Sequence, residues 1–132
     1  MLESIPIPQI ENILDHLPIQ LTFADANDII RFYSHSEKRI FKRTADILGT
    51  TVQSCHPPKS VPVVQQVLDD FKSGKRDVAE YWLRDSPSGS GRFMHIRYFA
   101  VRNRDNEYEG VLEVHQDITD IQKIEGEKRS FD

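Results

Sequence analysis

The sequence predicts an α+β domain with five antiparallel β-strands, in which several short helices and one longer helix lie between the second and third strands. Two patterns carry this prediction. Residues 91–119 contain two long strands joined by a polar turn, and the second strand alternates apolar and polar residues with the period of a half-buried strand. Residues 60–74 instead repeat apolar side chains at helical spacing, at Val64, Val67, Leu68 and Phe71. We expect this helix to cover one face of the sheet.

The N-terminal segment, residues 1–17, predicts a short cap helix. Four apolar residues recur there at helical spacing before Pro18 ends the pattern: Ile10, Ile13, Leu14 and Leu17. We expect this helix to lie near the other face of the sheet and to cover part of it, because that face would also carry apolar residues. The alternative is a tail that packs on a neighbouring chain.

Residues 19–34 predict a β-hairpin, with two short strands joined by the turn sequence DAND at residues 25–28. Residues 35–55 are irregular. Ser36 can cap a short helix that holds Phe41, and Thr44 can cap another, which Gly49 ends. Short helices of this kind often form one wall of a pocket.

The longer helix is expected to begin after Ser60, with Pro62 in its first turn, and to end at Gly74. A strand at residues 77–85 and a loop at residues 86–90 precede the long hairpin. Residues 120–128 predict a charged helix that leaves the domain. The expected organisation is therefore a cap helix at 1–17, the main domain at 18–119 and an outgoing helix or tail at 120–132.

The long hairpin has one register that leaves its inner face without charge. If Val101 lies opposite Val111, the inner face pairs Ala100 with Leu112, Tyr98 with Val114 and Met94 with Ile118. We expect this register, because a slip of one residue would bury Glu113 and His115.

Length and charge limit the function classes. The chain has 132 residues, which suits one domain, and its net charge is −4 without a basic block. Nucleic-acid binding is not expected, because phosphate recognition needs clustered Lys and Arg. No apolar run reaches the length of a membrane span, so we expect no membrane partner. The single cysteine excludes an internal disulfide and favours a cytoplasmic protein.

Three local sequences, in their order along the chain, resemble those of a PAS domain over residues 17–128. They are His56-Pro57 before the longest helix, the polar hairpin of residues 102–110, and the terminal triplet Asp117-Ile118-Thr119. The sequences CHPPKSV, DFKSGKRD and HIRYFAVR are similar to the C-terminal PAS-like module of bacterial hemerythrin-associated proteins of unknown function. Pro58 departs from the PAS pattern, which usually has an acidic residue there.

The resemblance implies a sensory and protein-interaction module without catalysis of its own, cut from a longer protein with effector domains. It also implies a cavity between sheet and helices that holds a small metabolite, a haem or nothing. The expected lining from the sheet is Phe23, Phe32, Met94, Ile96, Tyr98 and Leu112. The expected lining from the helical side is Phe41, Cys55, Val64, Val67 and Phe71. The same apolar stripe is also typical of an ordinary core.

A homodimer is the partner that the exposed apolar residues predict. Its surface would combine the cap-helix residues Ile10, Ile13 and Leu14 with Phe93, Phe99 and Val101 of the outer sheet face.

His56 and Cys55 leave two further interpretations open. Either side chain could be an axial ligand in a haem or redox sensor. Cys55 could also be a thiolate nucleophile, because a nearby imidazolium lowers a thiol pKa, although a buried inert thiol is the better explanation because no third orienting group can be identified. A photoactive flavin adduct is excluded, because the motif that surrounds its cysteine is missing. The histidines and the cysteine have no recognisable metal-ligand spacing.

Overall fold

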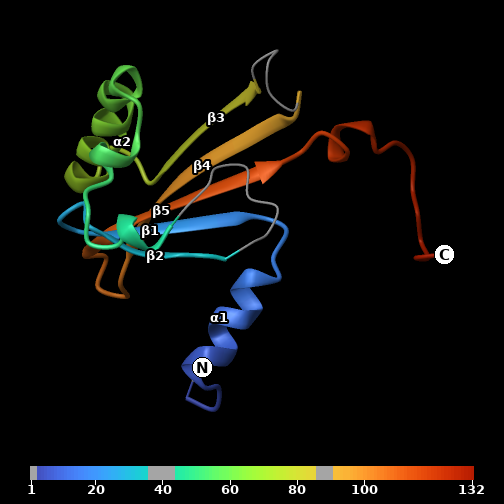
Figure 1. The fold of residues 1–132 in the computed structure, drawn as a ribbon, viewed down its shortest axis with the longest axis horizontal. Coiled ribbons are helices and arrows are strands. Elements are labelled where there is room, and N and C mark those ends of the chain that lie inside the picture. Colours follow the sequence, from blue (N-terminus) through green and yellow to red (C-terminus); the bar gives the residue numbers. More distant parts are fainter. Residues whose placement is uncertain (1–2, 36–43, 86–90) are drawn as a thin grey trace.

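Five antiparallel strands form one sheet in the order β2-β1-β5-β4-β3 (Figure 1). The structure is a computed structural model of the chain, and it describes residues 3–35, 44–85 and 91–132. The strands are β1 (Gln20–Asp25), β2 (Ile30–Tyr33), β3 (Val78–Arg84), β4 (Phe93–Arg102) and β5 (Tyr108–Asp117). The predicted fold class is confirmed, with the helices inserted between β2 and β3 as expected. The predicted short helix at Ser36 and Phe41 lies outside the described residues.

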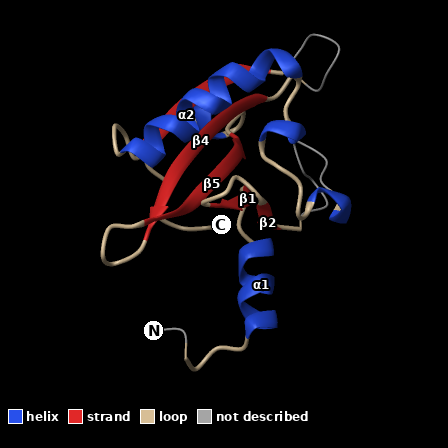
Figure 2. Ribbon diagram, turned by 90° about the vertical axis from the view of Figure 1, so that its left-hand side faces the viewer, coloured by secondary structure: helices blue, strands red, loops and turns tan. Residues whose placement is uncertain are grey.

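The helix α2 (Val61–Ser73) packs against one face of the sheet, which we call the inner face (Figure 2). It has Pro62 in its first turn and ends at Gly74, whose φ of 79° is in the left-handed region that glycine adopts without steric cost. Its apolar side is buried against strand residues in one cluster. The cluster comprises Ala24, Ile30, Val52, Val64, Val67, Leu68, Phe71, Ile96, Tyr98 and Val111.

Both predicted turns form, and a carboxylate or amide side chain organises each one. The Asp25 carboxylate accepts hydrogen bonds from the backbone N–H groups of Asn27 and Ile29, at 2.9 and 3.1 Å. The Asn103 side-chain oxygen likewise accepts from the N–H groups of Asp105 and Glu107, both at 2.9 Å. These contacts replace backbone hydrogen bonds that a turn cannot make, so the turns could be placed from the sequence.

The predicted register of the long hairpin is wrong by one residue. Ala100 lies opposite Val111, and Tyr98 lies opposite Glu113. The shift arises near the turn, where Val101 pairs with Gly110 but Arg102 pairs with Tyr108, so β5 has one extra residue in a bulge. Every side chain of β5 therefore changes face, and Glu113 and His115 point inward.

The outer face of the sheet carries the β5 residues Leu112 and Val114, which the predicted register placed inside. Phe23 lies opposite both Leu112 and Phe32, and all three occupy the face away from α2. Their expected position in the lining of an inner cavity is wrong. Gly110 is required beside them, because a Cβ there would approach the Ala24 carbonyl oxygen to 2.1 Å.

The helix α1 (Ile7–Asp15) lies on the outer side of the sheet but extends away from it (Figures 1 and 2). None of its residues is buried, so it does not provide the expected cover. Its C-terminal end is held by the Asp15 carboxylate, which accepts a hydrogen bond from the His35 N–H at 2.7 Å. A helix of this length has little stability alone, because most helical stability comes from packing.

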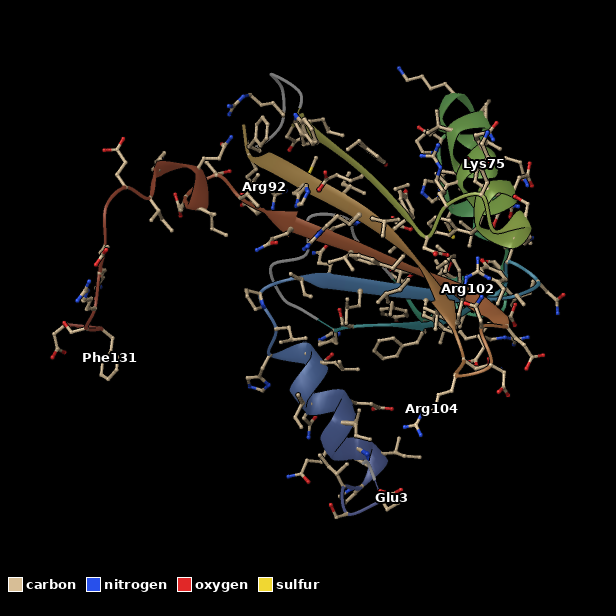
Figure 3. All side chains as sticks on the ribbon, turned by 180° about the vertical axis from the view of Figure 1, so that it is seen from behind. Glu3, Lys75, Arg92, Arg102, Arg104 and Phe131 are labelled. Carbon is tan, nitrogen blue, oxygen red and sulfur yellow. The ribbon has the colours of Figure 1, made fainter. Side chains whose placement is uncertain are left out.

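The C-terminal segment does not form the helix predicted over residues 120–128. It contains a short 3₁₀ helix at Ile121–Lys123 and then extends away from the sheet, with Phe131 near its end (Figure 3). Ile124 and Phe131 are exposed, and they bury no apolar surface that could stabilise a helix. Within the described ranges, no helix is long and apolar enough to cross a membrane.

Candidate functional site

A cavity of about 230 Å³ lies on the inner face, between strands β3, β4 and β5 and the segment that precedes α2. Two short 3₁₀ helices, Gln53–Cys55 and Pro58–Ser60, form the wall opposite the strands. The lining residues are Cys55, His56, Pro57, Ser60, Tyr81, Leu83, Ile96, Glu113 and His115. The cavity is therefore polar on one side, in contrast to the apolar pocket that the sequence suggested.

Glu113 and His115 form a buried ion pair at the bottom of this cavity. Each is 5% exposed, and the His115 Nε2 is in direct contact with the Glu113 Oε1. They stand two residues apart on the central strand β5, so both side chains point to the same face of the sheet, the inner one. A buried carboxylate is costly unless it is paired and hydrogen-bonded, and the neighbouring imidazole meets that need.

His56 faces the same carboxylate from the opposite wall. Its Nδ1 lies 2.9 Å from the Val52 carbonyl oxygen, and its Nε2 lies 3.9 Å from the Glu113 Oε1. A carbonyl oxygen can only accept, so Nδ1 carries a proton and the Nε2 of the neutral ring is an acceptor. In that state two acceptors face each other at a distance too long for a direct hydrogen bond.

Tyr81 adds a hydroxyl group to the rim of the cavity. Its oxygen lies 3.3 Å from the hydroxyl of Tyr98, which is the residue opposite Glu113 in the sheet. Burial raises the pKa of Tyr81, and the negative charge of Glu113 raises it further, against the effect of the Tyr98 hydrogen bond. The phenol is therefore a neutral donor at physiological pH.

The donors and acceptors of the cavity suit recognition of a small polar molecule. A ligand N–H or O–H placed between His56 and Glu113 would satisfy both acceptors, while Leu83 and Ile96 offer an apolar wall. No group of His, Cys, Asp and Glu side chains in the described part of the chain is arranged to hold a metal ion.

A second, more open hollow of about 760 Å³ runs between α2 and β3. It shares Ser60 and Tyr81 with the cavity, and apolar residues of both elements line most of it. No His, Cys or Met is among its lining residues.

The structure separates the predicted lining residues into four groups. His56, Cys55 and Ile96 line the cavity, and their contact with a ligand stays a prediction. Val64, Val67, Phe71 and Tyr98 belong to the core cluster, and Met94 is also buried. Phe23, Phe32 and Leu112 lie on the outer face, and Phe41 lies outside the described residues.

Sequence reasoning missed Glu113, His115 and Tyr81. A signal was present, because an acid and a histidine stand two residues apart in a strand where they alternate with apolar residues. Burial of such a pair is unfavourable for each residue separately, and only their contact with each other makes it acceptable.

Comparison with known proteins identifies the fold family. The model of the PAS domain family matches residues 10–119. The crystal structure of a C-terminal domain from Streptococcus mutans is 34% identical, with 92% of this chain and 91% of that chain covered and a TM-score of 0.81. No curated protein matches the sequence.

Two more distant structures share the fold alone. One is a sensory box sensor histidine kinase from Vibrio cholerae, with 15% identity, a TM-score of 0.60 and coverage of 85% of this chain and 90% of that chain. The other is VqmA bound to DPO, with 20% identity, a TM-score of 0.63 and coverage of 88% and 59%. The family match and the 34% relative both span most of the domain. The chain therefore belongs to the PAS domain family, whose members are generally non-catalytic sensory and signalling modules.

Proposed function

We propose that this PAS domain is a non-catalytic sensor that binds a small polar molecule in the cavity beneath β5. The observation that carries the proposal is the buried Glu113–His115 pair, which faces His56 across the cavity. If these positions served only the stability of the core, apolar residues there would stabilise the fold at least as well as the charged pair. Polar groups that converge in a cavity are instead typical of ligand recognition.

The ligand should be small and should carry a hydrogen-bond donor beside an apolar part. A volume of 230 Å³ lies below the range of about 300–1,000 Å³ of sites for drug-sized ligands. Glu113 is the only lining residue with a charge that does not depend on a histidine proton, so an amine or N–H heterocycle suits the cavity better than an anion. The VqmA complex with DPO supports only the general point that one protein of this fold has a ligand.

A haem does not fit this site. The cavity that contains His56 and Cys55 is too small, and the larger hollow has no His, Cys or Met to serve as an axial ligand. His56 also directs its Nε2 toward a carboxylate. If purified protein gains a Soret band on addition of haem, and His56→Ala abolishes it, the redox or gas sensor replaces our proposal.

A thiol enzyme has less support. The Nδ1 of His56 is held by the Val52 carbonyl, while the Cys55 sulfur lies 3.7 Å from the Thr50 hydroxyl. This arrangement lacks a base that is oriented by a third group toward the sulfur. We expect Cys55 to react with a maleimide dye mainly after denaturation.

The wider context of the domain follows from its family and its relative. We infer a cytoplasmic module of a longer bacterial protein, and the narrower group of hemerythrin-associated proteins is supported by a relative that is itself a C-terminal domain. A ligand would alter packing between α2 and the sheet. The change would pass through β5 to Asp117-Ile118-Thr119 and then to an effector, by analogy with the family.

The ligand proposal can be tested with two matched probes, aniline and N,N-dimethylaniline, followed by ¹⁵N NMR titration. Both have an aromatic ring, but only aniline has N–H donors. We expect aniline at millimolar concentration to shift the amide signals of β5 and of residues 53–60, and the dimethyl compound to shift them at least several-fold less. His56→Leu, which removes the Nε2 acceptor, should reduce the aniline response.

The control is Glu80→Gln, which changes a carboxylate on the outer face and should leave the response unchanged. Equal shifts by both probes would show that the cavity selects shape without using its acceptors. Shifts confined to other parts of the domain would contradict ligand binding in this cavity.

A further inference from the structure

In the part of the chain that the structure describes, the strand β3 is a free edge of the sheet. It is the last strand in the order β2-β1-β5-β4-β3, and it pairs with β4 on one side only. Six of its seven residues are exposed, and these include Val78 at 52%, Trp82 at 60% and Leu83 at 39%. An exposed apolar edge strand presents unpaired backbone groups and is a ready template for another strand.

The hydrogen bonds at the two ends of β3 show which backbone groups are available. The Ala100 N–H donates to the Asp77 carbonyl, and the Asp85 N–H donates to the Arg92 carbonyl, each within 2.9 Å. Antiparallel strands alternate between hydrogen-bonded and non-hydrogen-bonded pairs, so the odd-numbered residues bond to β4. The N–H and C=O groups of the even-numbered residues therefore point to the free edge, at Val78, Glu80, Trp82 and Arg84.

We propose that this edge binds the β3 strand of a second copy of the chain, antiparallel and around a two-fold axis at Trp82. Charge complementarity selects this register. With Trp82 opposite the partner's Trp82, Glu80 lies opposite the partner's Arg84 in both halves of the pair. Centring the axis on Glu80 would oppose two like charges, and centring it on Tyr81 would leave both charged residues without a charged partner.

The side chains of the edge are compatible with this pairing. One oxygen of Glu80 lies 2.6 Å from the His95 Nε2, which leaves its other oxygen for an arginine. Arg84 uses one terminal nitrogen to donate to the Gly91 carbonyl, at 3.1 Å, and keeps further N–H donors. Paired copies would join their sheets into one continuous sheet, with the central Trp82 residues side by side on the outer face.

The hollow between α2 and β3 gives room for the pairing on the inner face. Tyr81 lines this hollow and, in the proposed register, lies opposite the partner's Leu83. An added strand would therefore place Tyr81 and Leu83 side chains of the second copy beside the apolar residues Val63 and Val64 of α2. This surface differs from the one at α1 and the outer face that the sequence suggested for a dimer.

Charge-reversal variants test the interface by sedimentation velocity over a concentration series. The wild-type chain should show concentration-dependent dimerisation. Glu80→Arg should raise the dissociation constant about tenfold or more, since two attractive pairs become repulsive. The double variant Glu80→Arg with Arg84→Glu should restore most of the association. Ile13→Asp on α1 is the control and should leave it unchanged.

A cross-link tests the register. In the proposed dimer the two Trp82 Cα atoms form a hydrogen-bonded pair at about 5.5 Å, which is within disulfide range. Trp82→Cys should therefore form a covalent dimer under mild oxidation. Val78→Cys should not, because its two copies lie far apart, and the wild-type chain with only Cys55 is the blank.

Each result decides the proposal. A chain that stays monomeric at every concentration overturns it and leaves the β3 edge to a strand of another protein. A dimer that responds to Ile13→Asp and not to the charge reversals also overturns it, in favour of α1. Far-UV circular dichroism must show that each variant is folded. None of these measurements uses a ligand, so failure here is distinct from failure of the cavity proposal.

Discussion

Replacement of Glu113 should reveal how the buried ion pair is balanced. The side chains of Glu113 and His115 are 7% and 6% exposed and are in direct contact, with His56 nearby at 3.9 Å. Glu113→Met keeps a similar volume but leaves His115 buried without its charged partner. Removal of one member of a buried pair typically costs about 3–5 kcal/mol. We expect the free energy of unfolding to fall by that amount at pH 7.

The double variant Glu113→Met with His115→Leu should recover most of this loss. Replacement of a whole buried pair by apolar residues of similar volume is often neutral or stabilising, by about 1–4 kcal/mol. The two substitutions should therefore be strongly non-additive, with a coupling energy of about 2 kcal/mol or more. Recovery of stability would indicate that the pair is present for the cavity and its ligand, since folding alone would not need it.

Urea unfolding followed by far-UV circular dichroism measures both effects. The chain supplies a matched control in Glu80 and His95, which are the same pair of residue types on the outer face. The His95 Nε2 lies 2.6 Å from the Glu80 Oε2, and the Glu80 side chain is 48% exposed. At a protein concentration that keeps the chain monomeric, Glu80→Met should cost no more than about 1 kcal/mol, because exposed ion pairs contribute little. If Glu113→Met costs no more than Glu80→Met, the pair is not buried as described and the reasoning fails.

Three further outcomes follow from other contacts. Burial raises the pKa of Tyr108 from 10.0 to about 12, so the free energy of unfolding should fall as pH rises from 10 to 12. Tyr108→Phe should lessen that fall, which urea midpoints measured at pH 9 and 11 would show. Gly110→Ala should cost more than about 2 kcal/mol in thermal or urea unfolding, because its Cβ would overlap the Ala24 carbonyl oxygen. Hydrogen bonds from Thr119 lower the pKa of Asp117, so Asp117→Asn should lessen the loss of stability as pH falls from 5 to 3.

Each of these three measurements has its own control or contrary result. Gly126→Ala is the control for Gly110, because its Cβ would meet no atom within 4 Å. Tyr108→Phe should also be tolerated at pH 7, since the buried Tyr108 hydroxyl has no hydrogen-bond partner among the described residues. A large loss there would show that the hydroxyl has a partner. An unchanged acid profile in Asp117→Asn would mean that the Thr119 contacts persist without the charge.

Much of the fold could be predicted because it depends on neighbouring residues. Helix α2 follows from its apolar spacing and from Gly74, and the turns follow from Asp25 and Asn103. The triplet Asp117-Ile118-Thr119 could also be recognised, and its physical role is local. The Asp117 carboxylate accepts from Thr119, whose hydroxyl oxygen accepts from the Phe93 N–H at 2.8 Å.

The site was predicted only in part because it depends on the register. His56 and Cys55 stand beside a helix start that the sequence locates, so their place on a cavity wall followed from their position in the chain. Glu113 and His115 could not be placed in the same way. One extra residue in the bulge beside Gly110 moves the whole of β5 to its other face, and sequence alternation is equally consistent with both faces.

The sequence by itself determined the order of the strands and of helix α2, the turns and the family, because local propensity, periodicity and short motifs are properties of adjacent residues. Only the tertiary structure decided that the cavity is polar and that α1 leaves the sheet uncovered. Glu113 can be buried because strand pairing turns it and His115 to the same inner face, where the two side chains are in contact, and an apolar helix stripe is buried only where a partner surface meets it. Both depend on contacts between distant parts of the chain, which periodicity alone does not specify.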